Sequence, residues 1–226
     1  MKFYFDGCSF TAGGGFKKFG HENYKNLLWT HHVCDHFNAE EHNFAIGGAA
    51  NDTILRNFFV KNYDELESYD CFFIQTTYPS RGEWFDDVKG YWRRYKFKAY
   101  KRKEELRKID PDLENWIDFY LKRIYSDKGG GIKEKVTFRS IDSHLKALGK
   151  PVFWSTVIKA RECRMNYHMN FKDPNQTTNL PKTKFTSFPD GHPNVEGNQE
   201  IAAEIIRRRK NENIFCWCIL DIRRRT

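Results

Sequence analysis

Short apolar runs alternate with stretches of helical periodicity along most of this chain, and this alternation limits the folds open to it. Four runs are predicted to form buried strands: Lys2–Phe5, His42–Ala45, Asp70–Thr76 and Pro151–Val157. Strands that alternate with helices favour a mostly parallel sheet with helices on both faces. The predicted fold class is therefore α/β, with a sheet layered between helices.

The helices are predicted from apolar spacing and from residues that suit helix ends. One is expected over Glu22–Phe37, a second from Asn51 or Asp52 to about Tyr63, a third ending near Leu148–Gly149, and a last one from about Val195 to Lys210. Glycine at 149 suits the position after a helix, where a left-handed backbone is common.

Length and composition fit one domain. The chain has 226 residues, of which 39% are hydrophobic and 16% aromatic, so it can bury a substantial core. We expect one domain over 1–210, followed by a basic tail over 211–226. No apolar run approaches the roughly 20 residues that a membrane helix needs, and the N-terminus lacks a signal-peptide pattern. These features predict a soluble protein, intracellular or carried in a particle made inside a cell, such as a virion.

A stretch of about fifty residues, from about 80 to 131, interrupts the alternation after the third strand. Trp84, Val88, Tyr91 and Tyr95 recur at helical spacing, and a second helix is expected from Asp110-Pro111 to about Tyr125. The triple glycine at 129–131 is expected to end this helical insertion as a hinge or loop. Neither this triple glycine nor the one at 13–15 fits a nucleotide-phosphate loop.

Two polar segments near opposite ends of the chain predict the chemistry. Ser9 follows the first strand, and Gly7 just before it permits a tight turn at the carboxyl edge of the sheet, where open α/β sheets bind ligands. His192 precedes Pro193 and lies just before the last helix, with Asp190 two residues earlier. A serine nucleophile needs a base, and that base needs a carboxylate to orient it. The order Ser, Asp, His therefore suggests a serine hydrolase.

These segments resemble the SGNH or GDSL-type hydrolases. Residues 7–11 look like the first block of that family, residues 43–52 like the second, and residues 190–194 like the last. The resemblance implies a three-layer, flavodoxin-like α/β/α fold, a Ser9-His192-Asp190 triad, and backbone N–H groups of Ser9 and Gly48 in the oxyanion hole. It implies ester hydrolysis, in particular an esterase or O-acetyl esterase acting on a small-molecule or carbohydrate ester, with no metal or organic cofactor.

The chain departs from the family pattern at two points. The third block, Gly-x-Asn-Asp, is absent after the third strand, so its side-chain donor to the oxyanion would come from Asn51, Gln75 or Thr77, with Asn51 preferred. Asp190 also lies two residues before His192, where the family commonly has three. Arg81 and Glu83 follow the third strand at the expected rim of the site, where they would bind substrate or form an ion pair.

Positive charge is concentrated in one segment. Residues 89–108 hold ten basic residues against Glu104 and Glu105, a surplus of eight that equals the net charge of the whole chain, +8. Aromatic residues are interleaved with these charges, as in surfaces that bind single-stranded nucleic acid. The alternatives are a solvated helix face, favoured by the helical spacing, and a basic lid that attracts acidic sugars or phosphorylated esters. The rival to an enzyme is therefore a catalytically silent domain that binds nucleic acid or a glycan through this segment.

Metal-binding patterns are weak. His32 and His36 lie four residues apart on a predicted helix but lack clear further ligands, and Cys216-Trp217-Cys218 has no second cysteine pair. The six cysteines show no framework spacing and are expected to be reduced thiols.

Overall fold

A computed structural model describes residues 1–78, 81–96, 115, 119, 123, 127–159, 167–172, 183–184 and 186–211. Its main element is a six-stranded sheet with the order β2-β1-β3-β6-β7-β8. The first four strands are parallel: β2 (Glu40–Asn43), β1 (Lys2–Asp6), β3 (Cys71–Thr76) and β6 (Val152–Lys159). Two antiparallel strands, β7 (Tyr167–Lys172) and β8 (Thr183–Lys184), extend the sheet beyond β6. The predicted α/β class with a mostly parallel sheet is confirmed.

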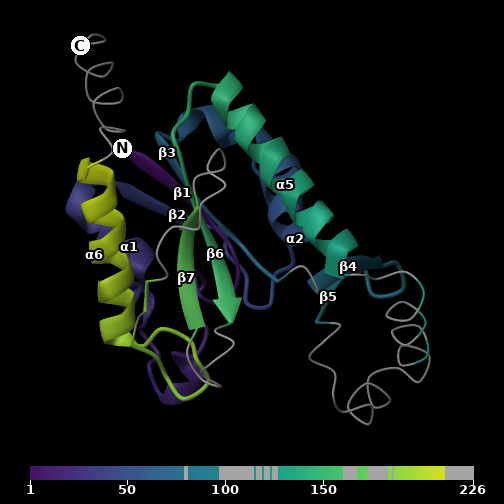
Figure 1. The fold of residues 1–226 in the computed structure, drawn as a ribbon, viewed down its shortest axis with the longest axis horizontal. Coiled ribbons are helices and arrows are strands. Elements are labelled where there is room, and N and C mark those ends of the chain that lie inside the picture. The colour runs from purple at the N-terminus through teal and green to yellow at the C-terminus, as the bar shows by residue number, and fades with distance from the viewer. Residues whose placement is uncertain are drawn as a thin grey trace.

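One face of the sheet is covered by α1 (Trp29–Phe37) and α6 (Val195–Asn211), which lie together beside the strands in Figure 1. Phe3, Phe5 and Phe73 project from β1 and β3 into this layer, where Phe5 and Phe73 stack at 4.6 Å between ring centroids. Apolar residues of both helices complete the cluster, including Trp29, Val33, Ile201 and Ile205. The period-two alternation of the strands sends every second side chain to this face.

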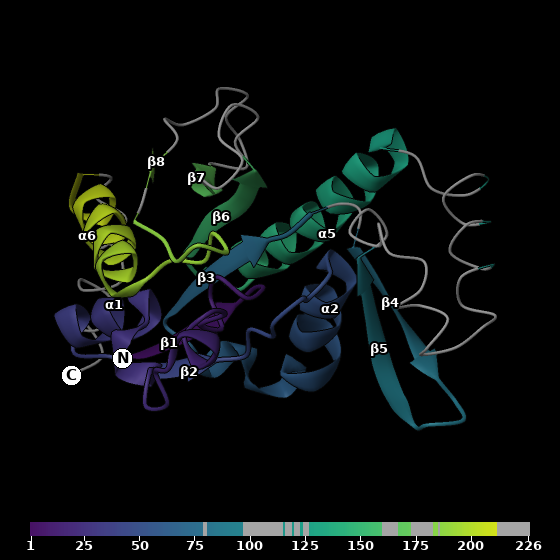
Figure 2. The same ribbon diagram turned by 90° about the horizontal axis from the view of Figure 1, so that it is seen from below.

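The opposite face carries α2 (Asn51–Arg56), a π-helical turn (Asn57–Lys61), a 3₁₀ segment (Tyr63–Ser68) and the long helix α5 (Asp127–Ala147). Its cluster includes Tyr4, Phe72 and Trp154 from the strands and Ile54, Phe58, Ile141 and Leu145 from the helices. Figure 2 shows the sheet between this layer and the α1/α6 layer. The predicted helices on both faces are therefore present.

The first helix and the second strand begin at other residues than predicted. The first helix was expected from Glu22, but a 3₁₀ turn (Lys25–Leu27) precedes α1, which begins only at Trp29. A further 3₁₀ turn (Lys17–Phe19) lies in the loop after β1. The second strand lies two residues earlier than expected, because β2 is an edge strand whose partly exposed residues give little apolar pattern.

The helix predicted from Trp84, Val88, Tyr91 and Tyr95 is wrong. These residues belong to an antiparallel hairpin of β4 (Arg81–Asp86) and β5 (Tyr91–Lys96), separate from the main sheet. The turn decides the outcome: Lys89 N–H bonds to the Asp86 side chain, and Gly90 takes the left-handed backbone that a tight turn requires. Val88 lies in that turn and is 94% exposed, so its helical spacing from Trp84 and Tyr91 was coincidental.

The expectation of a hinge at Gly129–Gly131 is also wrong, because these glycines lie inside α5. The later part of α5 packs Ile141 and Leu145 into the core, and this tertiary packing outweighs the poor helix propensity of glycine. The helix expected over 110–125 lies almost wholly outside the described residues, and so does the basic tail expected over 211–226, apart from residue 211. No helix in the described part of the chain is long and apolar enough to cross a membrane.

Candidate active site

The turn after β1 exposes Ser9 at the carboxyl edge of the sheet. A Cβ atom on Gly7 would lie 2.7 Å from Thr11 Oγ1 and 2.8 Å from Gln75 Cβ, so only glycine fits there. The neighbouring Cys8 is buried, and its thiol contacts Gln75 Oε1 at 3.3 Å. Backbone bonds from Thr11 and Ala12 to the Cys8 carbonyl close the turn, which leaves the partly exposed Ser9 directed away from the core.

His192 is held by a compact loop before α6. Phe188 N–H bonds to the His192 carbonyl at 2.8 Å, and Gly191 turns the chain with a φ of 86°. The Asn194 side chain caps α6 by accepting from Gly197 N–H at 2.9 Å, while Asn198 donates to the Pro193 carbonyl. These bonds fix the position of the imidazole relative to the helix.

The structure brings the three predicted triad residues together although Ser9 is 183 positions from His192. Ser9 Oγ lies 2.9 Å from His192 Nε2, and His192 Nδ1 lies 3.1 Å from Asp190 Oδ1. The second pair meets the distance for an ion pair but not the angles for a hydrogen bond, and Asp190 Oδ1 also accepts from the backbone N–H of His192 at 3.2 Å. The two-residue spacing therefore brings the Asp190 carboxylate to the His192 ring.

The electrostatics of Asp190 keep it ionised. Partial burial alone would raise its pKa, but the backbone and ring of His192, together with Lys18, favour the carboxylate, and the pKa lies below its usual value. Lys18 Nζ is 3.4 Å from Asp190 Oδ2. A negative charge beside Nδ1 is what an imidazole needs when it accepts a proton at Nε2.

A glycine-rich segment, residues 13–15, packs directly on the Ser9 and His192 pair. A Cβ on Gly14 would lie 2.6 Å from Ser9 Cβ and 2.9 Å from His192 Nε2. Gly14 N–H donates to the Ser9 carbonyl at 2.5 Å, and the Phe10 ring lies 5.1 Å from the imidazole. The sequence-based predictions gave this triple glycine no role. The feature that pointed to one was a run of residues without side chains close to the predicted nucleophile.

The loop with Gly48 is tied to the turn that carries Ser9. Ile46 N–H donates to the Gly7 carbonyl at 3.2 Å, and Gly48 follows with a φ of 78°. The Asn51 side chain forms two bonds with the backbone of Thr77, accepting from its N–H at 2.8 Å and donating to its carbonyl at 3.1 Å. Asn51 is thus engaged in joining this loop to the end of β3.

Gln75 lies beneath the nucleophile turn and is 1% exposed. Its Oε1 accepts from the Thr11 hydroxyl at 3.0 Å as well as from Cys8, while its Nε2 has no hydrogen-bond partner within the described residues. Among the three candidates for a side-chain oxyanion donor, Gln75 is the one whose amide N–H groups have no acceptor there.

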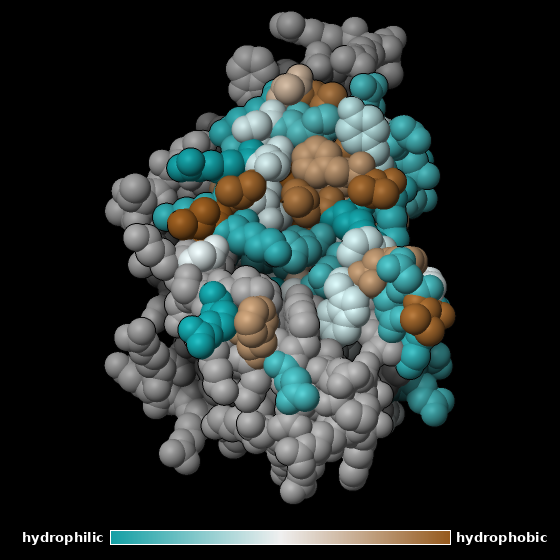
Figure 3. Space-filling model, turned by 90° about the vertical axis from the view of Figure 1, so that its right-hand side faces the viewer, coloured by the Kyte–Doolittle hydropathy of each residue, from teal (hydrophilic) through white to brown (hydrophobic). Residues whose placement is uncertain are grey.

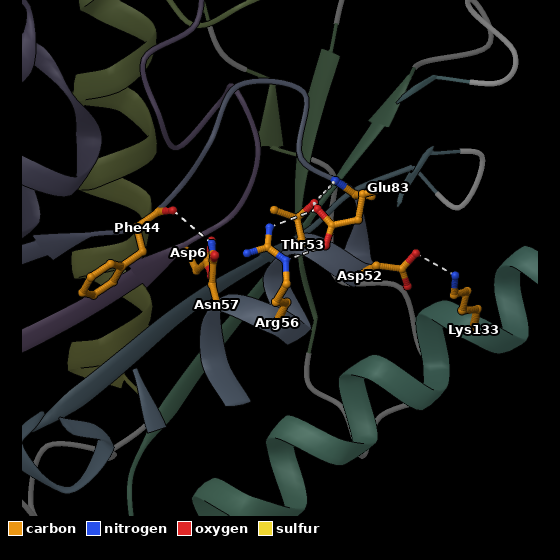
Figure 4. Close-up of polar contacts among 9 residues, drawn as sticks. Asp6, Phe44, Asp52, Thr53, Arg56, Asn57, Glu83 and Lys133 are labelled. Carbon is orange, nitrogen blue, oxygen red and sulfur yellow. Dashed lines mark hydrogen bonds and ion pairs between the residues drawn. The ribbon is translucent and has the colours of Figure 1, made fainter. Parts of the chain in front are cut away.

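Arg81 and Glu83 lie on β4 and contact the segment that follows Gly48. Arg81 Nη1 donates to the Ala49 carbonyl at 3.2 Å and to Thr77 Oγ1 at 2.6 Å. The Glu83 carboxylate is nearly inaccessible to solvent, pairs with Arg56 and accepts a hydrogen bond from the Thr53 hydroxyl (Figure 4). The Thr53 hydroxyl in turn accepts a hydrogen bond from Ala50 N–H. The hairpin thus holds the loop of residues 47–51, hereafter the Gly48 loop.

A buried carboxyl that sequence reasoning missed lies at the end of β1. Asp6 is fully buried and accepts from Gly7 N–H at 2.7 Å and from the Tyr4 hydroxyl at 3.2 Å. Asn57 lies 3.5 Å from Asp6 Oδ1 and also donates to the Phe44 carbonyl (Figure 4). Burial raises the pKa of Asp6 well above its usual value, although these hydrogen bonds oppose the shift. Asp6 therefore links the end of β1 to the π-helical turn that carries Asn57.

The described residues contain no group of three or more His, Cys, Asp and Glu side chains that could hold a metal ion. Burial lowers the pKa of His32, which lies on α1 with His36. Cys8, Cys34 and Cys71 are buried, and Cys163, Cys216 and Cys218 lie outside the described residues.

Comparison with known proteins adds no relative: no protein-family model matches the chain, and no curated protein sequence does.

Proposed function

We propose that the protein is a serine ester hydrolase of the SGNH type. The observation that carries the proposal is the contact series from Ser9 Oγ to His192 Nε2 and from His192 Nδ1 to Asp190, built from two ends of the chain. A Ser-His-Asp series at the carboxyl edge of a parallel sheet is the arrangement that activates a serine for acyl transfer. The strand order β2-β1-β3-β6 supports the flavodoxin-like form of the fold.

In the proposed reaction, Ser9 Oγ attacks the ester carbonyl while His192 Nε2 takes the serine proton. His192 then gives that proton to the leaving alcohol, and Asp190 stabilises the imidazolium and orients the ring. In the second half, water attacks the acyl-serine while His192 Nε2 takes its proton, and His192 returns this proton to Ser9 Oγ as the acid leaves. The backbone N–H groups of Ser9 and Gly48 would stabilise the oxyanion, where one donor is worth about 2.7 to 4 kcal/mol. Asn51 was the preferred side-chain donor, but its amide is bonded to Thr77, whereas Gln75 Nε2 has no partner among the described residues.

The substrate is proposed to be a small-molecule or carbohydrate ester, and the chemistry assigned to the residues requires no cofactor. Arg81 and Glu83 were expected either to bind substrate or to form an ion pair. Their contacts with the Gly48 loop and Arg56 support a positioning role instead.

A fluorophosphonate probe tests the proposal directly, because it reacts with a serine only when a base activates the hydroxyl. We expect labelling at Ser9 in the wild type and in Cys8→Ala, and none in Ser9→Ala or His192→Ala. Asp190→Asn should keep the fold and lower kcat on short p-nitrophenyl esters by up to about 10⁴-fold. Labelling at Cys8, or full labelling in His192→Ala, would refute the assignment.

A further inference from the structure

A groove of about 880 Å³ lies between the helix layer and the β4–β5 hairpin. Its apolar lining comes from α2 and the π-helical turn on one side and from the hairpin on the other: Leu55, Phe59, Val60, Phe85, Tyr91 and Trp92. Val60, Tyr91, Phe85 and Trp92 are all substantially exposed, the last at 42%. Figure 3 shows apolar side chains gathered among hydrophilic ones on the side of the molecule that carries the hairpin.

The wall formed by Trp92 is preorganised. The Arg56 guanidinium lies 4.7 Å from the centre of the Trp92 ring, and the Phe85 ring packs against it at 5.5 Å. Arg56 is itself fixed by the buried carboxylate of Glu83, at 2.9 Å. A rigid aromatic wall loses little conformational entropy when a ligand binds.

The charges around the groove do not cancel. Glu83 is paired with Arg56, and Asp52 is paired with Lys133 at 2.6 Å (Figure 4). Lys61 and Arg94 also line the groove and have no carboxylate partner among the described residues. Arg94 donates to the Gly47 carbonyl, a neutral acceptor, at 3.0 Å. The groove therefore combines an apolar interior with two cations that no carboxylate pairs within the described part of the chain.

We infer that this groove is a binding site for an amphipathic anion, an aliphatic or aromatic body carrying one carboxylate or sulfonate group. The apolar body would lie against Leu55, Phe59 and Trp92, and the acid group would bind Lys61 and Arg94. Aromatic and aliphatic side chains make up the apolar lining, and the two lining carboxylates, Glu83 and Asp52, are already paired, which favours an apolar body over a hydroxyl-rich sugar or nucleotide. The site does not depend on the chemistry proposed for Ser9.

The test uses 8-anilinonaphthalene-1-sulfonate, a fluorescent aromatic sulfonate, with the full chain. We expect the dye to bind saturably and dodecanoate to displace it. Dodecyltrimethylammonium and adenosine monophosphate should displace the dye at least tenfold less well. Lys61→Gln should weaken dodecanoate binding about tenfold and Lys61→Gln/Arg94→Gln further, because each removes a cation from the acid group. Lys2→Gln, at an exposed lysine that begins β1 and does not line the groove, is the matched control and should bind as wild type.

Ser9→Ala should bind both anions as the wild type does, so loss of ester hydrolysis and loss of this site are distinguishable. Equal displacement by the cationic detergent, or unchanged affinity in Lys61→Gln/Arg94→Gln, would overturn the inference. Stronger displacement by adenosine monophosphate than by dodecanoate would also overturn it and favour a nucleic-acid surface. Absence of any saturable binding would show that the groove is not accessible to ligands.

Discussion

At the scale of single residues, Gly14 controls the geometry of the proposed catalytic pair. In Gly14→Ala the new methyl group would meet Ser9 Cβ at 2.6 Å and the His192 ring at 2.9 Å, so one of the two side chains must move. A misplacement of about 1 Å can cost roughly 100-fold in rate, and we expect fluorophosphonate labelling of Ser9 to slow by that order.

Gly131→Ala is the control for that prediction. Gly131 lies in α5 with no atom within 4 Å of an added Cβ, so alanine there should leave labelling unchanged and stabilise the helix by up to about 1 kcal/mol. Labelling of Gly14→Ala at the wild-type rate would show that the segment over Ser9 yields without disturbing the pair.

Asp6 predicts a dependence of stability on pH. Its pKa is near 3.8 in an unfolded chain and well above that when folded, so between these values the unfolded state releases a proton that the folded state keeps. The stability associated with Asp6 is therefore complete below about pH 3.8 and is lost as pH rises through the folded pKa.

Urea unfolding of the wild type and Asp6→Asn at several pH values measures this contribution. Asparagine keeps the shape of the side chain and does not ionise, so the free energy of unfolding of the variant should fall less steeply as pH increases above about 4. The variant should therefore gain stability relative to the wild type as pH rises. Parallel curves for the two proteins would mean that Asp6 is ionised in the folded state.

At the scale of elements, the hairpin is the feature that positions the Gly48 loop. Arg81 joins the Ala49 carbonyl to Thr77 Oγ1, and Arg94 bonds to the Gly47 carbonyl, so both neighbours of Gly48 are held by β4 and β5. Together with the Asn51–Thr77 bonds, the Arg81 contacts join the Gly48 loop to the end of β3.

Arg81→Gln should therefore lower kcat on a short p-nitrophenyl ester by about tenfold with little change in KM, the pattern of an interaction that matters in the transition state. Arg139→Gln, an exposed arginine on α5, should leave both constants unchanged. A rise in KM at constant kcat would instead assign Arg81 to substrate binding, as the sequence first suggested.

At the scale of the whole molecule, both helix layers pack on one sheet, so the described residues should unfold as one unit. Phe72 and Phe73 are neighbours on β3 that project to opposite faces, into the α2/α5 layer and the α1/α6 layer respectively. Each Phe→Leu substitution should cost about 1 kcal/mol, and both variants should show one transition that coincides by circular dichroism and tryptophan fluorescence. Two separate transitions in either variant would contradict a single domain.

The sequence by itself determined the features that depend on local pattern. Buried central strands such as β1 and β3 are continuous apolar runs, and α6 has strong helical spacing, so class and chain order could be predicted. The order Ser9, Asp190, His192 was also readable, because each residue lies beside a turn or helix signal at a predicted strand or helix end. The roles of these three residues stay a proposal.

Only the tertiary structure decided features that depend on contacts between distant segments. The spacing of apolar residues from Trp84 to Tyr95 matched a helix, but the turn at Asp86–Gly90 and cross-strand pairing form a hairpin. The glycines at 129–131 are helical because the later part of α5 packs in the core. The close approach of Gly14 to Ser9, the engagement of Asn51 by Thr77 and the burial of Asp6 likewise arise from neighbours remote in sequence. A one-dimensional pattern records periodicity and turn chemistry, whereas burial and partner choice are set when the layers come together.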